Sequence, residues 1–284
     1  MQKRAVAIND ISCYGRCALT VTLPVLSSAG VECAIVPTVV LSTHLAYPGP
    51  AIHSLTYTLE GITNHFKSIN VEFDAIAIGY LNDASQTDLV IDFIDKFKTE
   101  NTIIIADPTM ADHGKMYGNP AFDEKFIQGM RNIVKKSDYT VPNITEAAFL
   151  CGLPYENAPH TKSYIEKLLY TLAKLGVKYP IVTGIIFEDD EIGSACFDSE
   201  ANYVHYHFAQ KYDGKFIGTG DLFAAAFLGA VMNGFSPEFS CKIAAEFVSY
   251  SIAKSLKVNT KDSMAINFEQ SLSFYMKKLK IIGQ

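Results

Sequence analysis

The sequence predicts an α/β fold: a mostly parallel central sheet covered by helices on both faces. Short apolar runs, typical of strands buried on both faces, alternate with amphipathic helical stripes. Around residues 192–197 and 203–208 the runs come closer together, which predicts an antiparallel hairpin. This order of elements is typical of a three-layer αβα sandwich with some antiparallel edge strands. Because no repeat, low-complexity tract or Gly/Ser linker interrupts the chain, we expect a single domain over residues 1–284.

Six apolar runs are the predicted strands of the main sheet. Each is only four to eight residues long, which favours a strand over a helix. The runs cover residues 5–8, 34–41, 75–78, 102–106, 138–141 and 180–183.

Helical stripes separate the predicted strands. One of them is formed by Ile52, Leu55, Leu59, Ile62 and Phe66. The next follows Ser85 as its N-cap, with Asp88 at the capping-box position. A third, over residues 165–175, is closed by Gly176. Towards the C-terminus, long helices are predicted from Gly220, from Pro237 with Ser236 as cap, and from Asn267.

Composition and charge limit the classes of partner. The net charge is −6 and the pI is near 5.6, so a broad basic surface for nucleic acid is not expected. No apolar run reaches the ~18 residues that cross a bilayer, and polar residues interrupt the first apolar run before it could serve as a signal peptide. The six cysteines form no CxxC pair and are interpreted as reduced thiols. We therefore expect a cytoplasmic protein that acts on small molecules and binds neither nucleic acid nor a membrane.

Polar or small residues follow every predicted strand of the main sheet. Each is ordinary turn chemistry by itself. Ligands of open α/β sheets, however, bind beyond the carboxyl ends of the strands, and six such groups at one edge favour a binding site there. In chain order the residues are Asn9 and Asp10, Ser42 to His44, Gly79 and Tyr80, Asp107, Asn143 with Glu146, and Thr183.

The strongest local signal is Gly218-Thr219-Gly220-Asp221 before an apolar, Ala-rich segment. Backbone N–H groups at a helix N-terminus form an anion site, and glycines let a phosphate approach the backbone. Asp221 could then accept a proton from an attacking hydroxyl while the amides hold the transferred phosphoryl group. The alternative is that the glycines only permit a tight loop and that Asp221 caps the helix.

Phosphoryl transfer also requires a cation, and the sequence offers oxygen ligands for one. Asn143 and Glu146 are one helical turn apart, with Thr145 as the expected cap between them. Together with Asp107 they suit Mg²⁺, which keeps most of its waters and takes few protein ligands. Glu146 could instead simply favour a helix N-terminus. Neither GxxxxGK[ST] nor, after the first strand, GxGxxG is present, which argues against a P-loop enzyme and a dinucleotide enzyme.

Taken in order, these segments resemble the ribokinase superfamily in its pyridoxal kinase form. The sequence GTGDLFAAAFL at 218–228 resembles the superfamily's carboxy-terminal signature, and DPTMADHGKMY at 107–117 resembles its DPVxGD…G…Y segment. VPNITE at 141–146 is similar to TPNxxE, and GYL at 79–81 to the GY segment. CYGRC at 13–17 and VLSTH at 40–44 are similar to the family's substrate loops. The match spans about residues 5 to 230.

The resemblance implies a ribokinase-like fold and ATP-dependent phosphorylation of the 5′-hydroxymethyl group of pyridoxal, pyridoxine or pyridoxamine. It also implies Mg²⁺ as cofactor and a homodimer. Asp221 would be the general base, and Gly218, Thr219 and Gly220 would form the anion hole. The residues implied at the nucleotide, its phosphates and the metal are Asn143, Glu146, Asp107, Asp112 and Thr183. Those implied around the pyridine ring are Asp10, Ser42, His44 and Tyr80.

Two departures from the family pattern, and a comparison with a related family, leave other functions open. Many pyridoxal kinases carry Ser where Asp10 stands, and Asp10 could favour a cationic substrate such as the aminomethyl form. Val141 replaces the common Thr. Related hydroxymethylpyrimidine kinases typically have Cys where Asp221 stands, so Asp221 argues against that function without excluding it. From a different class, the chain could be a nucleotide-binding regulator without catalysis, which the intact Asp221 disfavours.

Overall fold

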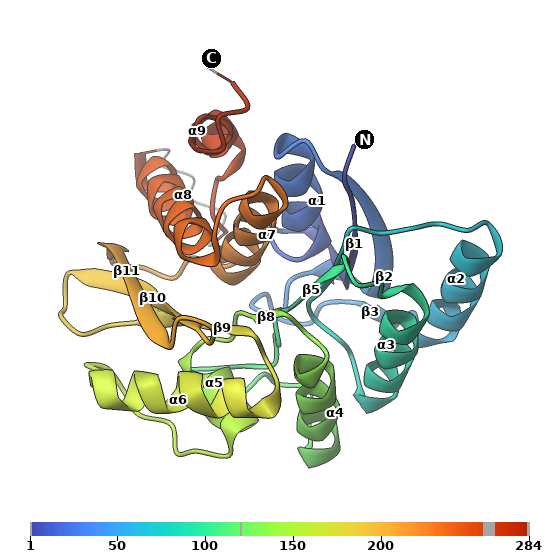
Figure 1. The fold of residues 1–284 in the computed structure, drawn as a ribbon, viewed down its shortest axis with the longest axis horizontal. Helices are drawn as coiled ribbons and strands as arrows, with labels where there is room; N and C mark the ends of the chain where they lie inside the picture. Colours follow the sequence, from blue (N-terminus) through green and yellow to red (C-terminus); the bar gives the residue numbers. More distant parts are fainter. Residues whose placement is uncertain (1, 120, 258–264, 283–284) are drawn as a thin grey trace.

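In the computed structural model, which describes residues 2–119, 121–257 and 265–282, one nine-stranded sheet runs through the molecule (Figure 1). Its order is β11-β10-β9-β8-β5-β4-β1-β2-β3. The strands are β1 (Arg4–Tyr14), β2 (Glu32–Thr43), β3 (Ile52–Ser54), β4 (Ala75–Ile78), β5 (Ile103–Ala106), β8 (Tyr139–Thr140), β9 (Tyr179–Ile185), β10 (Glu191–Asp198) and β11 (Tyr203–Gln210). The six strands from β2 to β9 in this order are parallel, and β3, β10 and β11 add antiparallel edges. The predicted α/β class and the late hairpin are confirmed.

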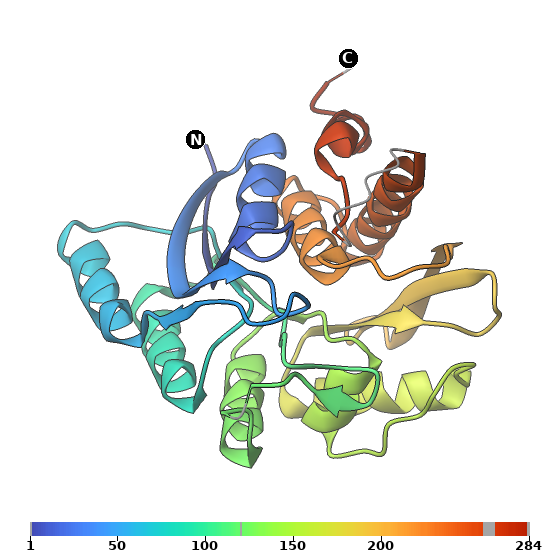
Figure 2. The same cartoon turned by 180° about the vertical axis from the view of Figure 1, so that it is seen from behind.

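Helices cover both faces of this sheet (Figures 1 and 2). One layer holds α1 (Leu19–Ser28), α7 (Thr219–Met232), α8 (Pro237–Lys257), a short 3-10 turn (Glu269–Ser271) and α9 (Leu272–Lys278). The other holds α2 (Thr56–Ser68), α3 (Ala84–Phe97), α4 (Glu124–Lys135), α5 (Ile144–Cys151) and α6 (Lys162–Leu175). Among the described residues, no helix has the length and apolar character needed to cross a membrane.

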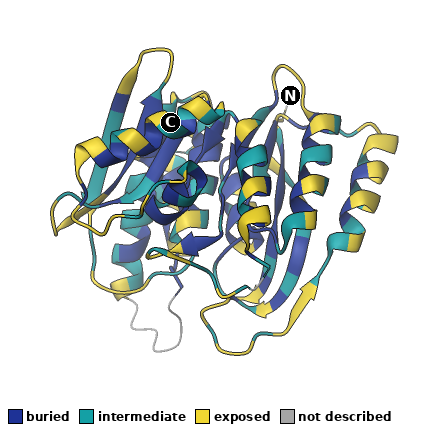
Figure 3. Cartoon of the chain, turned by 90° about the horizontal axis from the view of Figure 1, so that it is seen from below, coloured by how far each residue is buried: buried dark blue, intermediate teal, exposed yellow. Residues whose placement is uncertain are grey.

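Each central strand contributes to two hydrophobic cores, one under each helix layer. In β1, Val6 and Ile8 pack toward α2–α6, whereas Ala5 packs toward α1, α7 and α8. Successive strand residues point to opposite faces, so both sets must be apolar. This is why the strands read as continuous apolar runs. Figure 3 shows the result, with buried residues along the strands and exposed ones on the outward faces of the helices.

Strands β1 and β2 are longer than predicted, with 11 and 12 residues. Pairing with β4 ends at Ile8, but pairing with β2 continues to Tyr14 through an irregularity between Asn9 and Ile11. Asn9 and Asp10 therefore lie inside β1, not after it as the sequence predicted. They nevertheless face the carboxyl edge, because the neighbouring strand has ended there. Thr183 similarly lies within β9 rather than beyond it.

Several helix boundaries also differ from the prediction. Ile52 belongs to β3, so the second helix begins only at Thr56. Asp83, not Ser85, caps α3, since its carboxylate accepts from the N–H groups of residues 85 and 86. The helix expected from Asn267 is replaced by the 3-10 turn and the short α9.

Other predicted boundaries hold. Gly176 ends α6 with a positive φ of 118°, as expected. Ser236 accepts the N–H of Phe239 at 3.4 Å, consistent with its predicted capping of α8. A two-stranded ribbon of β6 (Ala111–Asp112) and β7 (Lys115–Met116) lies beside the main sheet and precedes α4.

Candidate active site

The N-terminus of α7 packs closely against another segment of the backbone. Gly218 occupies the N-cap with a φ of 85°, a conformation that strains any residue with a side chain. A Cβ at this position would overlap the carbonyl oxygen of Arg16, so the missing side chain lets α7 lie directly against the β1–α1 connection. Gly220 is exposed and has nothing near the position of a Cβ. The space beside Gly220 is therefore open, next to first-turn N–H groups that lack intrahelical acceptors.

Asp221 projects from the same turn toward the end of β1. Its Oδ1 lies 3.5 Å from Nδ2 of Asn9, and the backbone N–H of Ala18 also interacts with the carboxylate. Burial raises the pKa of Asp221, and the Ala18 and Asn9 donors oppose that rise. Gly218, not Asp221, is the N-cap, and Asp221 adds a carboxylate to the first turn of the helix.

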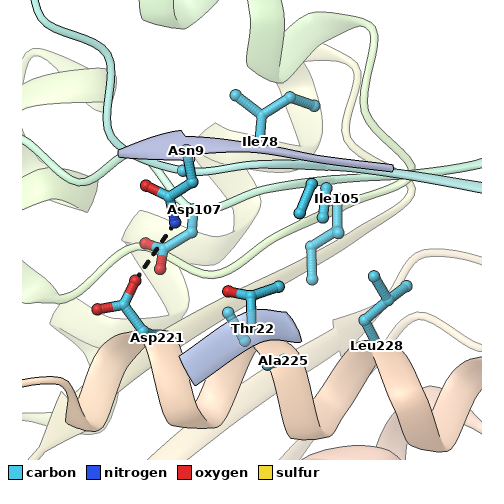
Figure 4. Close-up of a pocket in the computed structure, with 12 residues that line it drawn as sticks. Asn9, Thr22, Ile78, Ile105, Asp107, Asp221, Ala225 and Leu228 are labelled. Carbon is cyan, nitrogen blue, oxygen red and sulfur yellow. Dashed lines mark hydrogen bonds between the residues drawn. The ribbon is translucent and has the colours of Figure 1, made fainter. Parts of the chain in front are cut away.

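A cavity of about 30 Å³ lies behind Asp221, between α7 and the ends of the central strands (Figure 4). Its walls are mainly apolar, and Asn9, Asp107 and Asp221 bring polar groups to one end. A volume of this size holds about two water molecules.

The carboxyl groups of Asp107, Glu146 and Asp221 lie near one another in this region. The pKa of Asp107 is raised well above its usual value by burial, and further by the charges of Glu146 and Asp221. Within the described part of the chain, none of the three forms a salt bridge. Nor do the described His, Cys, Asp and Glu side chains converge into a ready-made metal cage of three or more. The carboxylate oxygens of Asp107 and Glu146 are of the type that Mg²⁺ takes as ligands, and Mg²⁺ keeps most of its own waters.

Glu146 faces inward and is occupied by backbone donors. It is 3% exposed, and it accepts N–H groups from Met110 at 3.0 Å, Ala111 at 3.4 Å and Asn143 at 2.9 Å. Asn143, not the expected Thr145, caps α5 and completes a capping box with Glu146. Burial raises the pKa of Glu146 to about 8, although these three N–H groups act in the opposite direction. Glu146 therefore stabilises the start of α5, as the alternative interpretation of the sequence predicted. Its carboxylate also holds the segment that follows Asp107 in place.

The predicted nucleotide-side residues fall into two groups. Asn143 and Thr183 are neighbours, since they form a parallel bridge and the Thr183 N–H donates to Pro142 at 2.9 Å. Asp112 instead lies exposed on the β6–β7 ribbon. Its Oδ2 is 3.5 Å from Nε2 of His113. It stands at the rim, where its charge still reaches Glu146.

Of the predicted ring-binding residues, Asp10 lies close to Asp221, and Tyr80 lies close to Asp10. Asp10 is 7% exposed and accepts the Ser12 hydroxyl at 2.9 Å; burial, and then the charge of Asp221, raise its pKa to about 7. Tyr80 is buried nearby, close enough for Asp10 to affect its pKa, which burial raises to about 12. Asp10 thus lies within electrostatic reach of both Asp221 and Tyr80.

The other two predicted ring-binding residues come from the end of β2 and the loop after it. His44 is buried, its Nδ1 accepts the Ala46 N–H at 3.3 Å, and its Nε2 has no partner among the described residues. Gly15 lies against the His44 ring, where a Cβ would overlap it. Ser42 is exposed and its hydroxyl accepts the Ala51 N–H at 2.9 Å, so it holds the loop after β2.

Asn9 was predicted at the carboxyl edge of the sheet, but neither the contacts of its side chain nor those of the backbone of residues 16–18 were predicted. No sequence pattern marks them, because their importance comes from the distant segments they touch. Gly79 was the available signal: a Cβ there would overlap the Asn9 amide.

Comparisons with known proteins agree with the geometry. The model of the family described as phosphomethylpyrimidine kinase matches residues 30–266. A Bacteroides thetaiotaomicron protein, provisionally named a phosphomethylpyrimidine kinase and crystallised in an orthorhombic form with pyridoxal, is 31% identical. The alignment covers 97% of this chain and 96% of that one, with a TM-score of 0.92.

Two pyridoxal kinases are also similar. The crystal structure of pyridoxal kinase from Lactobacillus plantarum is 27% identical, covers 100% of both chains and has a TM-score of 0.89. Pyridoxal kinase from Dictyostelium discoideum is 27% identical over 81% of this chain and 78% of its own length.

Replacing each of the two glycines of the α7 turn by alanine should have a different effect on the free energy of unfolding. Gly218→Ala should lower the free energy of unfolding by about 1–3 kcal/mol, because φ is positive and the Cβ meets backbone. Gly220→Ala meets nothing and lies in a helix, so it should leave stability unchanged or raise it by up to about 1 kcal/mol. Urea unfolding of both variants measures the difference. Equal stability of the two variants would contradict the close packing of Gly218.

Proposed function

Since the chain belongs to the phosphomethylpyrimidine kinase family and to the ribokinase superfamily, and since pyridoxal kinases are among its relatives, we propose that it phosphorylates a B6 vitamer. The γ-phosphoryl group of ATP would be transferred to the 5′-hydroxymethyl group. The observation that carries the proposal is the half-buried Asp221 carboxylate in the same helical turn as the open amides of residues 218–220. A base and an anion site lie side by side, as phosphorylation of an alcohol requires.

In this reaction the substrate oxygen bonds to the γ-phosphorus while the bond from that phosphorus to the β,γ-bridging oxygen breaks. ADP leaves with the electron pair, and the hydroxyl proton passes to Asp221. Burial raises the pKa of Asp221 and so makes its carboxylate a stronger base than an exposed aspartate. The amides of Gly218, Thr219 and Gly220 would hold the phosphoryl oxygens during the transfer.

Asp221→Asn should lower kcat by about 10²–10⁴-fold, because the amide keeps the shape but cannot take the proton. Binding of ATP and pyridoxal should change little. Steady-state kinetics and calorimetric titration of the folded variant measure both quantities. Retention of more than a third of the wild-type kcat would refute the role of Asp221 as base.

For the nucleotide, we propose Mg²⁺ held mainly through its waters. Asp107 would supply the carboxylate for the ion, and Glu146, close enough for its charge to act on Asp107, is tied to backbone N–H groups. When bound, the ion would neutralise phosphate charge. Asn143 and Thr183 would contact the nucleotide, with Asp112 at the rim. Support for this arrangement comes from the Asp107 carboxyl group, whose pKa is raised by burial and by the charges of Glu146 and Asp221, so that a bound cation would favour its ionised form.

Asp107→Asn should raise the Mg²⁺ concentration needed for half-maximal activity by about tenfold, since it removes one charge-assisted contact to the hydrated ion. Pyridoxal affinity serves as the internal control and should stay nearly constant. A magnesium titration that matches the wild type would contradict the assignment of Asp107.

Around the vitamer ring we propose Asp10, Tyr80, His44 and Ser42. His44 offers a buried Nε2–H that has no protein partner among the described residues, so a ring oxygen or nitrogen could accept it. Asp10 has a pKa raised to about 7 and would regain its charge beside an aminomethyl group. The exposed Ser42 would contribute by shaping the loop after β2.

The second candidate substrate is hydroxymethylpyrimidine, which the name of the matching family favours. Pocket preferences of about 1–3 kcal/mol separate rings of such similar size. A coupled ADP assay with pyridoxal, pyridoxamine and hydroxymethylpyrimidine tests the proposal. We expect the highest kcat/KM with a B6 vitamer. Preference for hydroxymethylpyrimidine would reassign the substrate, and no ADP formation with any of the three would indicate a non-catalytic regulator.

We further propose that the chain works as one kinase domain, in a cytoplasmic homodimer. The six free cysteines suit a reducing compartment. Apolar side chains are exposed on the β1–β2–β3 end of the sheet, namely Tyr14, Ile35 and Ile52, beside the short edge strand β3. Sedimentation equilibrium should give about twice the 31.2 kDa chain mass. A single-chain mass at micromolar concentration would contradict the dimer.

A further inference from the structure

The side-chain amide of Asn9 is held in one orientation. Its Oδ1 accepts two backbone N–H groups, from Asp10 at 2.9 Å and from Tyr80 at 2.7 Å. Turning the amide over would place its NH₂ group against both donors and leave them without an acceptor, which is costly in the interior. The oxygen is therefore fixed on the side of β4, and the NH₂ group must point the other way.

That NH₂ group faces the Asp221 carboxylate. The distance from Nδ2 to Oδ1 is 3.5 Å, at the long end of hydrogen bonding (Figure 4). Asn9 is 6% exposed, and Gly79 packs so closely that a Cβ would overlap the amide. The side chain consequently has little freedom to rotate. It connects two central strands to the first turn of α7.

We propose that Asn9 is a positioning residue for Asp221. By engaging Oδ1, together with the Ala18 N–H donated to the same carboxylate, it leaves the other face of Asp221 directed at the substrate hydroxyl. This inference rests on the proposed role of Asp221 as base. The competing explanation is that Asn9 only satisfies the N–H groups of Asp10 and Tyr80. In that case its NH₂ group would have no effect on turnover.

Asn9→Asp keeps the acceptor oxygen for both N–H groups, removes the NH₂ donor and places a second carboxylate against Asp221, and Gly79→Ala, which displaces the amide without adding a charge, controls for that charge. Positioning predicts that kcat falls by about 10- to 100-fold, while KM for ATP and pyridoxal stays within about twofold. In the Asp221→Asn background the same change should alter kcat by less than about twofold, since the base is already absent.

Thermal unfolding gives a readout that does not depend on activity. Asn9→Asp should lower Tm, because two carboxylates then face each other. The double variant should recover most of that loss, because amide and carboxylate are simply exchanged across the contact. Gly79→Ala is a second probe, which displaces the intact Asn9 amide and should also lower kcat in the wild-type background only.

The inference is overturned if Asn9→Asp keeps more than half of the wild-type kcat. It is also overturned if the loss is the same size in the Asp221→Asn background, or if the double variant recovers no Tm. If the Asn9→Asp protein fails to fold, Gly79→Ala replaces it in the test. The loss of kcat that Gly79→Ala causes is then compared between the wild-type and the Asp221→Asn backgrounds. Failure of the proposed base would look different: Asp221→Asn alone would retain its kcat, whatever residue occupies position 9.

Discussion

The first turn of α7 lies against the backbone of the β1–α1 connection, because Gly218 has no side chain and the Arg16 carbonyl occupies the space that a Cβ would take. This contact sets the depth at which α7 enters the molecule. It carries Asp221 to the end of β1, within reach of Asn9 and of the Ala18 N–H. It also leaves the amides of residues 218–220 open at the carboxyl edge of the sheet. One backbone-to-backbone approach thus places both groups to which the proposed function assigns the base and the anion site.

The same edge gathers negative charge in a region with little solvent. Burial raises the pKa of Asp10, Asp107, Glu146 and Asp221. An acid whose pKa is raised in the folded state ionises more easily in the unfolded chain. These groups therefore lower the free energy of unfolding as the pH rises from their unfolded-state pKa to their raised folded-state pKa. Such a cost is typical of a functional site, where ligands supply the missing countercharge. Magnesium and a cationic vitamer would each do so here.

Residue pattern alone predicted the elements whose burial is simple. The strand over residues 75–78 was predicted with its observed bounds, because β4 is buried on both faces and ends where its apolar run ends. β1 was predicted too short because its continuation through Asn9 and Asp10 depends on pairing with β2, a distant segment whose register no local pattern specifies. Likewise both Asp83 and Ser85 can cap a helix, and only the backbone conformation selects Asp83.

The candidate site was predictable as a set of residues but not as a geometry. Strand ends and the GTGD turn pointed to Asp107, Asn143 and Asp221, whereas the inward rotation of Glu146 onto three backbone N–H groups required the observed loop.

A crystal structure with a non-hydrolysable ATP analogue and pyridoxal tests the central claim most directly. We expect the hydroxymethyl oxygen about 2.6–3.2 Å from an Asp221 carboxylate oxygen, with the γ-phosphate on the amides of residues 218–220. A hydroxymethyl group directed away from Asp221, or a γ-phosphate bound elsewhere, would contradict the account.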